Sequence, residues 1–180
     1  MGGCEIQAQN SNLPDSLDVY ADSVYVNFED SLDLEDLTLE PLSIPSMNAL
    51  LQEAHSHLNT RYCASGKKPS TGFDCSGFVH YCYDQTFGIN LPVSSREYKK
   101  VGKKVSIKNT QPGDIICFTG RNSRSRQLGH VGIVIENSSD IYFIHSASHG
   151  GIRVDKLSQK YYKDRFRSIR RISTPTSTNQ

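Results

Sequence analysis

The stretch TGFDCSGFV, residues 71–79, places a cysteine where a loop gives way to a predicted helix. Glycine and proline precede it, as is typical of a loop, and the spacing of Phe78, Val79 and Cys82 suits burial along one side of a helix. The positive end of a helix lowers the pKa of a thiol placed there. Cys75 is therefore a candidate nucleophile, and its own backbone N–H is a candidate oxyanion donor.

A candidate base for this thiol lies downstream, in GHVGIV at residues 129–134. The segment has the apolar character of a strand, and His130 stands at its start, where its ring would stay accessible. His145 lies on the next predicted strand, which antiparallel pairing would bring beside His130. There it would hold the tautomer of the first imidazole, the role that Asp or Asn has in other triads.

The elements around these motifs predict helices first and strands afterwards. Ser46 is expected to cap a helix that ends near Asn59, and a second helix is expected from Cys75 or Ser76 through Tyr83. Short helices are expected at 94–101 and 156–162, and strands at 114–118, 129–136, 141–146, 152–154 and 166–172. Because helices precede a cluster of strands, the sequence predicts an α+β fold with an antiparallel sheet.

Charge divides the chain into two parts. Residues 1–60 hold 11 Asp and Glu and no Lys or Arg, whereas residues 61–180 hold 8 acids and 20 bases. The two parts are electrostatically complementary, so we expect residues 1–45 to form an acidic extension packed on the domain, with a plain linker as the alternative. The domain itself is expected over residues 46–172, followed by a polar tail at 173–180.

Composition argues against several classes of protein. No run of 18 apolar residues occurs, so no membrane-spanning segment is expected. The five cysteines are irregularly spaced and include no Cys-x-x-Cys pair, so neither a disulfide framework nor a zinc site is indicated. No basic motif interleaved with aromatic residues points to nucleic acid. The lysines between residues 99 and 108 are interpreted as a solvated face, with attraction of anionic wall polymers as the alternative.

Five motifs together resemble the NlpC/P60 family of bacterial cell-wall cysteine peptidases, in order and over about residues 46–172. They are TGFDCSGFV at 71–79, LP at 91–92, QPGDI at 111–115, GHVGIV at 129–134 and FIHSA at 143–147. The resemblance implies a papain-like α+β fold, in which N-terminal helices pack on an antiparallel, barrel-like sheet. It also implies Cys75 as the nucleophile, His130 as the base and His145 as the third polar residue.

The same resemblance implies a reaction and a substrate class. The family hydrolyses peptidoglycan stem peptides, usually at the bond from γ-D-glutamyl to a diamino acid, through an acyl-enzyme that would form here on Cys75. Tyr62 is similar to the family's tyrosine near the active site, and Asp74 and Ser76 match residues that help bind a free substrate amine. No metal or cofactor is implied. A wall amidase or acyltransferase on the same scaffold, and a non-catalytic wall-binding module, remain alternatives.

The start of the chain bears on its location. Gly3 and Cys4 resemble the end of a bacterial lipoprotein signal, which makes Cys4 a candidate for lipidation. With the family resemblance, this predicts a bacterial protein of the cell envelope, periplasmic or lipid-anchored, or a secreted one. Membrane contact is then expected only through a lipid on Cys4. We expect a monomer whose partners are peptidoglycan stem peptides and that binds no nucleic acid.

Overall fold

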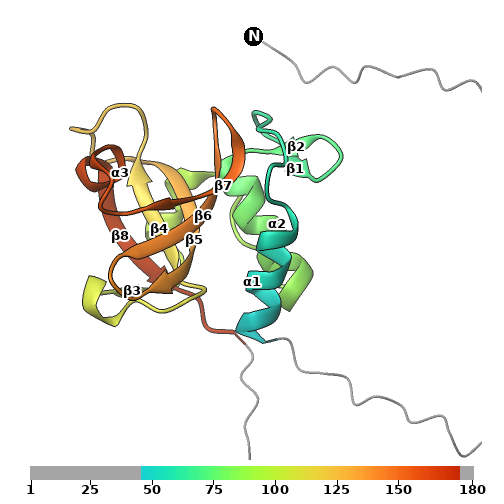
Figure 1. Cartoon of the computed structure of the whole chain (residues 1–180), viewed down its shortest axis with the longest axis horizontal. Helices are drawn as coiled ribbons and strands as arrows, with labels where there is room; N and C mark the ends of the chain where they lie inside the picture. The colour runs from blue at the N-terminus through green and yellow to red at the C-terminus, as the bar shows by residue number, and fades with distance from the viewer. Residues whose placement is uncertain (1–45, 175–180) are drawn as a thin grey trace, which may run out of the picture. The chain divides into compact units, whose positions relative to one another are not determined.

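The structure is a computed structural model that describes residues 46–174. The predictions for residues 1–45, including Cys4, lie outside the described residues, as does most of the predicted tail. Among the described residues, no helix has the length and apolar character needed to cross a membrane. Figure 1 shows the two longer helices on one side of the domain and a sheet on the other.

Helix α1 (Met47–Ser56) begins where the sequence predicts it. The hydroxyl of Ser46 accepts a hydrogen bond from the backbone N–H of Ala49 at 3.2 Å, which satisfies one of the unpaired donors of the first turn. The helix ends before the predicted Asn59, and Asn59 itself has a left-handed φ of 67°. Leu50 on its inner face is fully buried, so α1 is fixed by packing against the rest of the domain.

Helix α2 (Cys75–Phe87) begins at the predicted cysteine and runs past Tyr83, where the sequence predicts its end. Its C-terminus is set by Gly88, which takes the left-handed conformation with a φ of 66°. Its N-terminus is capped by Asp74, whose carboxylate accepts a hydrogen bond from the backbone N–H of Gly77. Both ends of the helix are therefore defined by single local residues.

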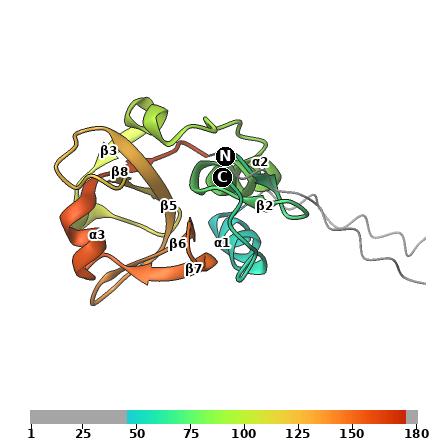
Figure 2. The ribbon, with the colours of Figure 1, turned by 90° about the horizontal axis from the view of Figure 1, so that it is seen from above.

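A six-stranded sheet forms the other half of the domain, in the order β3-β8-β4-β5-β6-β7, with all neighbours antiparallel. The strands are β3 (Lys103–Val105), β4 (Ile115–Thr119), β5 (Leu128–Asn137), β6 (Ile141–Ala147), β7 (Gly151–Lys156) and β8 (Phe166–Arg171). Seen from above, the sheet is strongly curved (Figure 2), yet its end strands β3 and β7 do not pair, so it stays open. The predicted α+β fold with an antiparallel sheet is confirmed.

Shorter elements complete the domain. They are the two-stranded pair β1 (Lys67–Lys68) and β2 (Gly72–Phe73), the 3-10 helices η1 (Ser95–Lys100) and η2 (Ile107–Asn109), and the helix α3 (Lys160–Arg165). The helix predicted at 94–101 corresponds to η1, and the one predicted at 156–162 forms slightly later, as α3. Strand β3 and the short pair β1 and β2 are not predicted from the sequence.

Two hydrophobic clusters bury the two faces of the sheet. The first lies between the sheet and helices α1 and α2 and includes Leu50, Phe78, Val79, Cys82, Val131, Ile133 and Ile144. The second includes Ile116, Phe118, Val134, Phe143, Tyr162 and Ile169, with Tyr162 supplied by α3. Neighbouring residues of β4 alternate between the clusters, because successive side chains of a strand point to opposite faces. Strand β4 is buried on both faces, and its sequence is therefore an almost continuous apolar run.

Three hydrogen bonds join the helical side to the sheet near the start of α2. The Ser146 hydroxyl, on β6, donates to the Phe73 carbonyl at 2.7 Å in a buried position. The backbone of Ile152, on β7, exchanges hydrogen bonds with Asn59 and Thr60, each at 2.9 Å. These contacts fix the loop before Cys75 against the strands that follow His130.

Candidate functional site

Cys75 is the first residue of α2, and the local sequence explains this position. Asp74 Oδ1 accepts a hydrogen bond from the backbone N–H of Gly77, the third residue of the helix, at 2.6 Å. The N–H groups of Cys75 and Ser76, in the first turn, have no acceptor within the helix. A Cβ on Gly77 would lie 2.1 Å from the Gly66 carbonyl oxygen. Only glycine at position 77 lets the preceding loop pack directly against this turn.

The environment of Cys75 favours a neutral thiol at rest. Burial, together with the Asp74 carboxylate, raises the pKa of Cys75 to about 11. The backbone amides of Val131, Ser76 and Cys75 itself lower the pKa of the thiol, because they stabilise negative charge on the sulfur. Val131 follows His130 on β5, so the thiol of α2 lies against the backbone of the strand that carries the candidate base. A base is needed to generate the thiolate.

His130 and His145 contact each other directly, with His130 Nε2 2.8 Å from His145 Nδ1. Their rings are nearly perpendicular, at 89°, with centroids 4.8 Å apart. Strands β5 and β6 pair with Ile133 opposite Ile144, which brings the next residue of β6, His145, close to Gly132 and to His130 beyond it. A Cβ on Gly132 would lie 3.0 Å from the Cβ of His145, so the glycine leaves space for the two rings to meet.

Both imidazoles are held neutral at pH 7. Burial, together with the neighbouring His145, lowers the pKa of His130 to about 3, whereas Asp155 acts to raise it. Burial also lowers the pKa of His145, against the hydrogen bond and charge of Asp155. A neutral imidazole donates from one ring nitrogen and accepts at the other. The close pair therefore consists of one donor nitrogen and one acceptor nitrogen.

A carboxylate that is not predicted from the sequence lies behind this pair. His145 Nε2 is 2.9 Å from Asp155 Oδ2, and the same oxygen accepts hydrogen bonds from the Tyr162 hydroxyl at 2.7 Å and Arg153 Nε at 2.8 Å. Burial opposes ionisation, but hydrogen bonds from His145, Tyr162 and Arg153 hold the pKa of Asp155 well below its usual range. The sequence signal for Asp155 is its place on β7, two residues beyond the partner of His145.

A pocket of about 660 Å³ gathers the predicted catalytic residues. Tyr62, Cys75, His130 and His145 all line it, as does Asp155. Burial raises the pKa of the Tyr62 phenol, and negative charge on Cys75 and Asp74 raises it further, in keeping with a phenol close to the thiol. The helix terminus and the sheet therefore contribute opposite walls of one cavity.

The remaining wall of the pocket is rich in positive charge. Arg121, Arg153 and Arg165 line it together with Asp155. The Arg165 guanidinium stacks on the Tyr161 ring at 3.8 Å and donates to the Arg121 carbonyl at 3.2 Å, which fixes its position. The wall therefore favours anionic groups.

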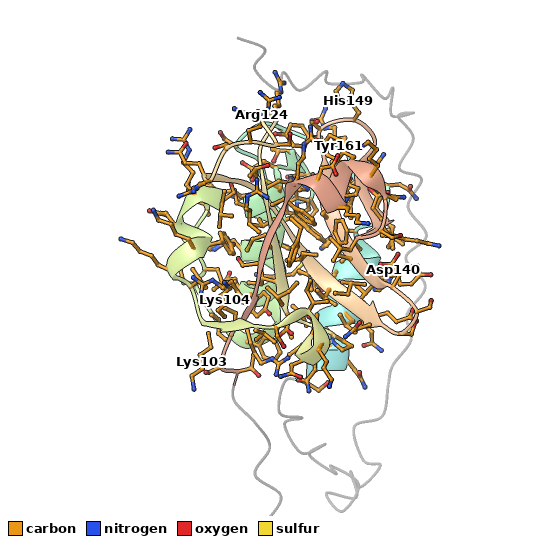
Figure 3. The ribbon with its side chains drawn as sticks, turned by 90° about the vertical axis from the view of Figure 1, so that its left-hand side faces the viewer. Lys103, Lys104, Arg124, Asp140, His149 and Tyr161 are labelled. Atoms are coloured by element: carbon orange, nitrogen blue, oxygen red, sulfur yellow. The ribbon has the colours of Figure 1, made fainter. Side chains whose placement is uncertain are left out.

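The mouth of the pocket is marked by exposed residues. Figure 3 shows His149 and Tyr161, which both line the pocket, at the same end of the domain as Arg124 of the loop between β4 and β5. Lys103 and Lys104 appear toward the other end in this view. These two of the predicted solvated lysines therefore lie away from His149 and Tyr161 at the pocket.

Two predicted substrate-binding residues are not part of the pocket wall. Ser76 is only 4% exposed, and its hydroxyl lies 2.9 Å from the Val93 carbonyl and 3.0 Å from Asp74 Oδ1. Asp74 is occupied as the cap of α2. Their role in binding a substrate amine stays a prediction. Within residues 46–174 no cluster of three or more His, Cys, Asp or Glu is arranged to hold a metal ion.

The chain is similar in sequence to proteins of one family. The chain matches the family model described as NlpC/P60 family over residues 59–171. It is 35% identical over 127 residues to the Gamma-DL-glutamyl hydrolase of Bacillus subtilis (strain 168), which covers 71% of this chain and 30% of that protein. It is also 35% identical over 108 residues to the Murein DD-endopeptidase MepS/Murein LD-carboxypeptidase of Escherichia coli (strain K12), which covers 59% and 53% respectively.

The fold is similarly shared with solved structures. An NlpC/P60 family protein from Bacillus cereus ATCC 10987 matches with a TM-score of 0.64 and 27% identity, over 72% of this chain and 41% of that one. The chain thus spans between 30% and 53% of the length of these relatives. The matched region contains Cys75, both histidines of the pair and Asp155. With its fold and this match over more than half its length, the chain belongs to the NlpC/P60 family.

Proposed function

We propose that this domain is a cysteine endopeptidase that hydrolyses peptidoglycan stem peptides, at the bond from γ-D-glutamyl to a diamino acid. One observation carries the proposal: the Cys75 thiol and His130 share one pocket, and His130 Nε2 is engaged by His145 at 2.8 Å. The other ring nitrogen, Nδ1, is then left to take the thiol proton. Family membership and the names of the curated relatives support the same substrate class.

The first half of the reaction forms an acyl-enzyme. His130 Nδ1 takes the proton of the Cys75 thiol, and the resulting thiolate attacks the carbonyl carbon of the scissile amide. The tetrahedral intermediate collapses when the imidazolium returns this proton to the leaving amine and the C–N bond breaks. The product is a thioester on Cys75, with the diamino acid fragment released as a free amine.

The second half restores the enzyme. Water attacks the thioester carbonyl while His130 Nδ1 accepts a proton from it. The C–S bond breaks, the carboxylic acid product leaves, and the proton on His130 returns to the sulfur. The N–H of Cys75 at the start of α2 is suited to donate to the oxyanion in both halves, because the positive end of the helix stabilises negative charge.

The charge of the pocket supports an anionic substrate. A γ-linked glutamyl residue keeps its α-carboxylate free, so the substrate carries negative charge close to the bond that breaks. Arg121 and Arg165 line the same pocket as Cys75 and offer guanidinium groups to a carboxylate. We further propose that the protein acts at the bacterial cell envelope or after secretion, where such peptides occur.

Cleavage of a synthetic γ-D-glutamyl–diaminopimelate peptide, followed by mass spectrometry of the products, tests this proposal. Cys75→Ala is expected to abolish cleavage without unfolding the domain. Cys82→Ala is the matched control, since Cys82 is a buried free thiol on the same helix and lies outside the pocket. This variant should retain activity in proportion to its folded fraction.

The products separate the proposal from its alternatives. Release of a new γ-glutamyl carboxylate and a new amine supports an endopeptidase. With a peptidoglycan fragment that retains its sugar as a second substrate, cleavage of the amide that joins the stem peptide to the sugar would assign a wall amidase. Transfer of the acyl group to an added amine would assign an acyltransferase. Binding of the peptide without turnover, together with a Cys75 that resists thiol reagents, would replace the enzyme with a wall-binding module.

A further inference from the structure

The hydrogen-bonded residues behind the thiol do not end at His145, and their last member is a carboxylate. We propose that Asp155 is a positioning residue that selects the tautomer of His145 and, through it, the tautomer of His130, so that the base presents a lone pair to the Cys75 thiol. This inference rests on the proposed function, because it assigns a role in the same reaction. It is carried by two consecutive contacts. His145 Nε2 lies 2.9 Å from Asp155 Oδ2, and His145 Nδ1 lies 2.8 Å from His130 Nε2.

The hydrogen bond between Asp155 and His145 determines which nitrogen of His145 carries a proton. An ionised carboxylate only accepts hydrogen bonds, so a ring nitrogen 2.9 Å from it must carry a proton. His145 Nε2 is therefore the protonated nitrogen. Since this ring is neutral, its Nδ1 holds a lone pair and only accepts.

The tautomer of His145 in turn determines the tautomer of His130. His145 Nδ1 accepts, so the nitrogen 2.8 Å from it, His130 Nε2, must be the donor. The neutral ring of His130 then has its lone pair on Nδ1, the nitrogen that faces away from His145. With the opposite tautomers, Nδ1 of His130 would carry a proton and could not take one from a thiol.

Asp155 stays ionised although its side chain is only 11% exposed, because two donors stabilise its charge. The Tyr162 hydroxyl and Arg153 Nε both donate to Oδ2, the oxygen that also contacts His145. Tyr162 comes from α3 and Arg153 from β7, so two separate elements stabilise the charge. The Arg153 side chain is 46% exposed, which screens its charge, so its directed hydrogen bond is the greater contribution.

The register of the sheet explains how Asp155 reaches this place. Arg153 on β7 pairs with His145 on β6, and Asp155 lies two residues further along the same face. Phe143, which pairs with Asp155 across the strands, belongs to the second hydrophobic cluster. Its ring packs against His145, with the two ring centroids 5.1 Å apart. The carboxylate and the imidazole are therefore held on one face by packing as well as by hydrogen bonding.

The direct test needs no substrate. Nitrogen-15 NMR of the imidazoles, in the full chain with selectively labelled histidine, reports which ring nitrogen of each neutral histidine is protonated. We expect protonated Nε2 on both His130 and His145. A wild-type protein with His130 protonated on Nδ1 would overturn the proposal, whatever any variant does. Because this measurement is independent of turnover, it judges the proposal even if no stem peptide is cleaved.

The kinetic test compares Asp155→Asn with Asp164→Asn. The amide of Asn is neutral and can donate to His145 Nε2, which supports the opposite tautomers. Neutralising the carboxylate that fixes the tautomer of a triad imidazole lowers kcat by about 10⁴-fold. Because His145 stands between Asp155 and His130, we expect a smaller loss of kcat, by at least about 10-fold, with KM unchanged. Asp164 is the control, because its side chain is 45% exposed and pairs with Lys160. This variant should keep the wild-type kcat.

A third variant protects the test against a general loss of structure. Asp155→Glu keeps the carboxylate, and we expect it to retain the wild-type tautomers and a larger share of kcat than Asp155→Asn. A merely structural role predicts otherwise: melting temperatures would fall while both tautomers and the kcat of the folded fraction stayed at wild-type values. That result for Asp155→Asn would refute the positioning role.

Discussion

The two walls of the pocket are built in different ways. On the helical wall, Cys75 is placed by residues next to it in sequence, with the cap at Asp74 and the close approach at Gly77. On the sheet wall, His130, His145 and Asp155 lie on three different strands and meet only through strand register. The candidate nucleophile is thus a local feature of the chain, whereas the candidate base and its partners are an assembled feature.

The two walls also differ in electrostatics, and the difference bears on mechanism. Burial raises the pKa of the Cys75 thiol to about 11 and lowers the pKa of His130 to about 3. Both shifts favour the neutral pair over the ion pair. The helical wall offers backbone N–H groups to negative charge, and the sheet wall offers Asp155 to positive charge. The pocket at rest therefore favours a neutral thiol beside a neutral imidazole.

The largest expected effect tests how rigidly the helical wall is built. Gly77→Ala would place a Cβ 2.1 Å from the Gly66 carbonyl oxygen, and we expect the free energy of unfolding to fall by about 3 kcal/mol, the upper end of overpacking costs. Gly88→Ala, at the other end of α2, is the control. Its Cβ would meet nothing within 4 Å, so only the left-handed φ costs energy, about 1 kcal/mol. Urea unfolding measures both, and equal losses would contradict the prediction.

The second effect tests the burial of the sheet wall. A His130 ring titrates near 6.5 when unfolded and near 3 when folded, so between these values the unfolded chain binds the extra proton. Stability therefore falls as pH falls through this window, by about 1.4 kcal/mol per pH unit for one such group. Between pH 6.5 and 5 wild type should lose about 2 kcal/mol more than His130→Gln.

Denaturant unfolding at the two pH values measures this difference. His149→Gln is the control, because His149 is exposed at the mouth of the pocket. Its loss of stability should equal that of the wild type. A pH dependence that is the same in His130→Gln and wild type would show that the ring is not buried in its neutral form.

The smallest effect separates the two roles of Asp74 on the helical wall. Asp74→Ala removes the cap of α2 and should lower the free energy of unfolding by about 1 kcal/mol, whereas Asp74→Asn keeps a capping oxygen and should change it little. Both variants remove the carboxylate that raises the pKa of Cys75. The pH profile of iodoacetamide labelling should therefore shift to lower pH in both, and an unchanged profile would contradict this electrostatic role.

The elements that could be predicted are those with a local signal. Ser46 caps α1 as expected, and α2 begins at the expected Cys75. The end of α2 was harder to predict, since apolar spacing fades before Gly88 stops the helix. Strand β3 carries two exposed lysines and no apolar alternation, so its pairing with β8 comes from tertiary contact alone.

Local sequence patterns predict the motif around the candidate nucleophile Cys75, the order of helices and strands, and the adjacency of His130 and His145. Each of these follows from short-range patterns or from one hairpin between neighbouring strands. Two features come from the packing of distant segments: Asp155, Arg153 and Tyr162 lie behind the histidines, and Ser76 is buried outside the pocket. The physical reason is that burial and hydrogen bonding between distant segments depend on strand register and helix packing, which no local pattern of residues encodes.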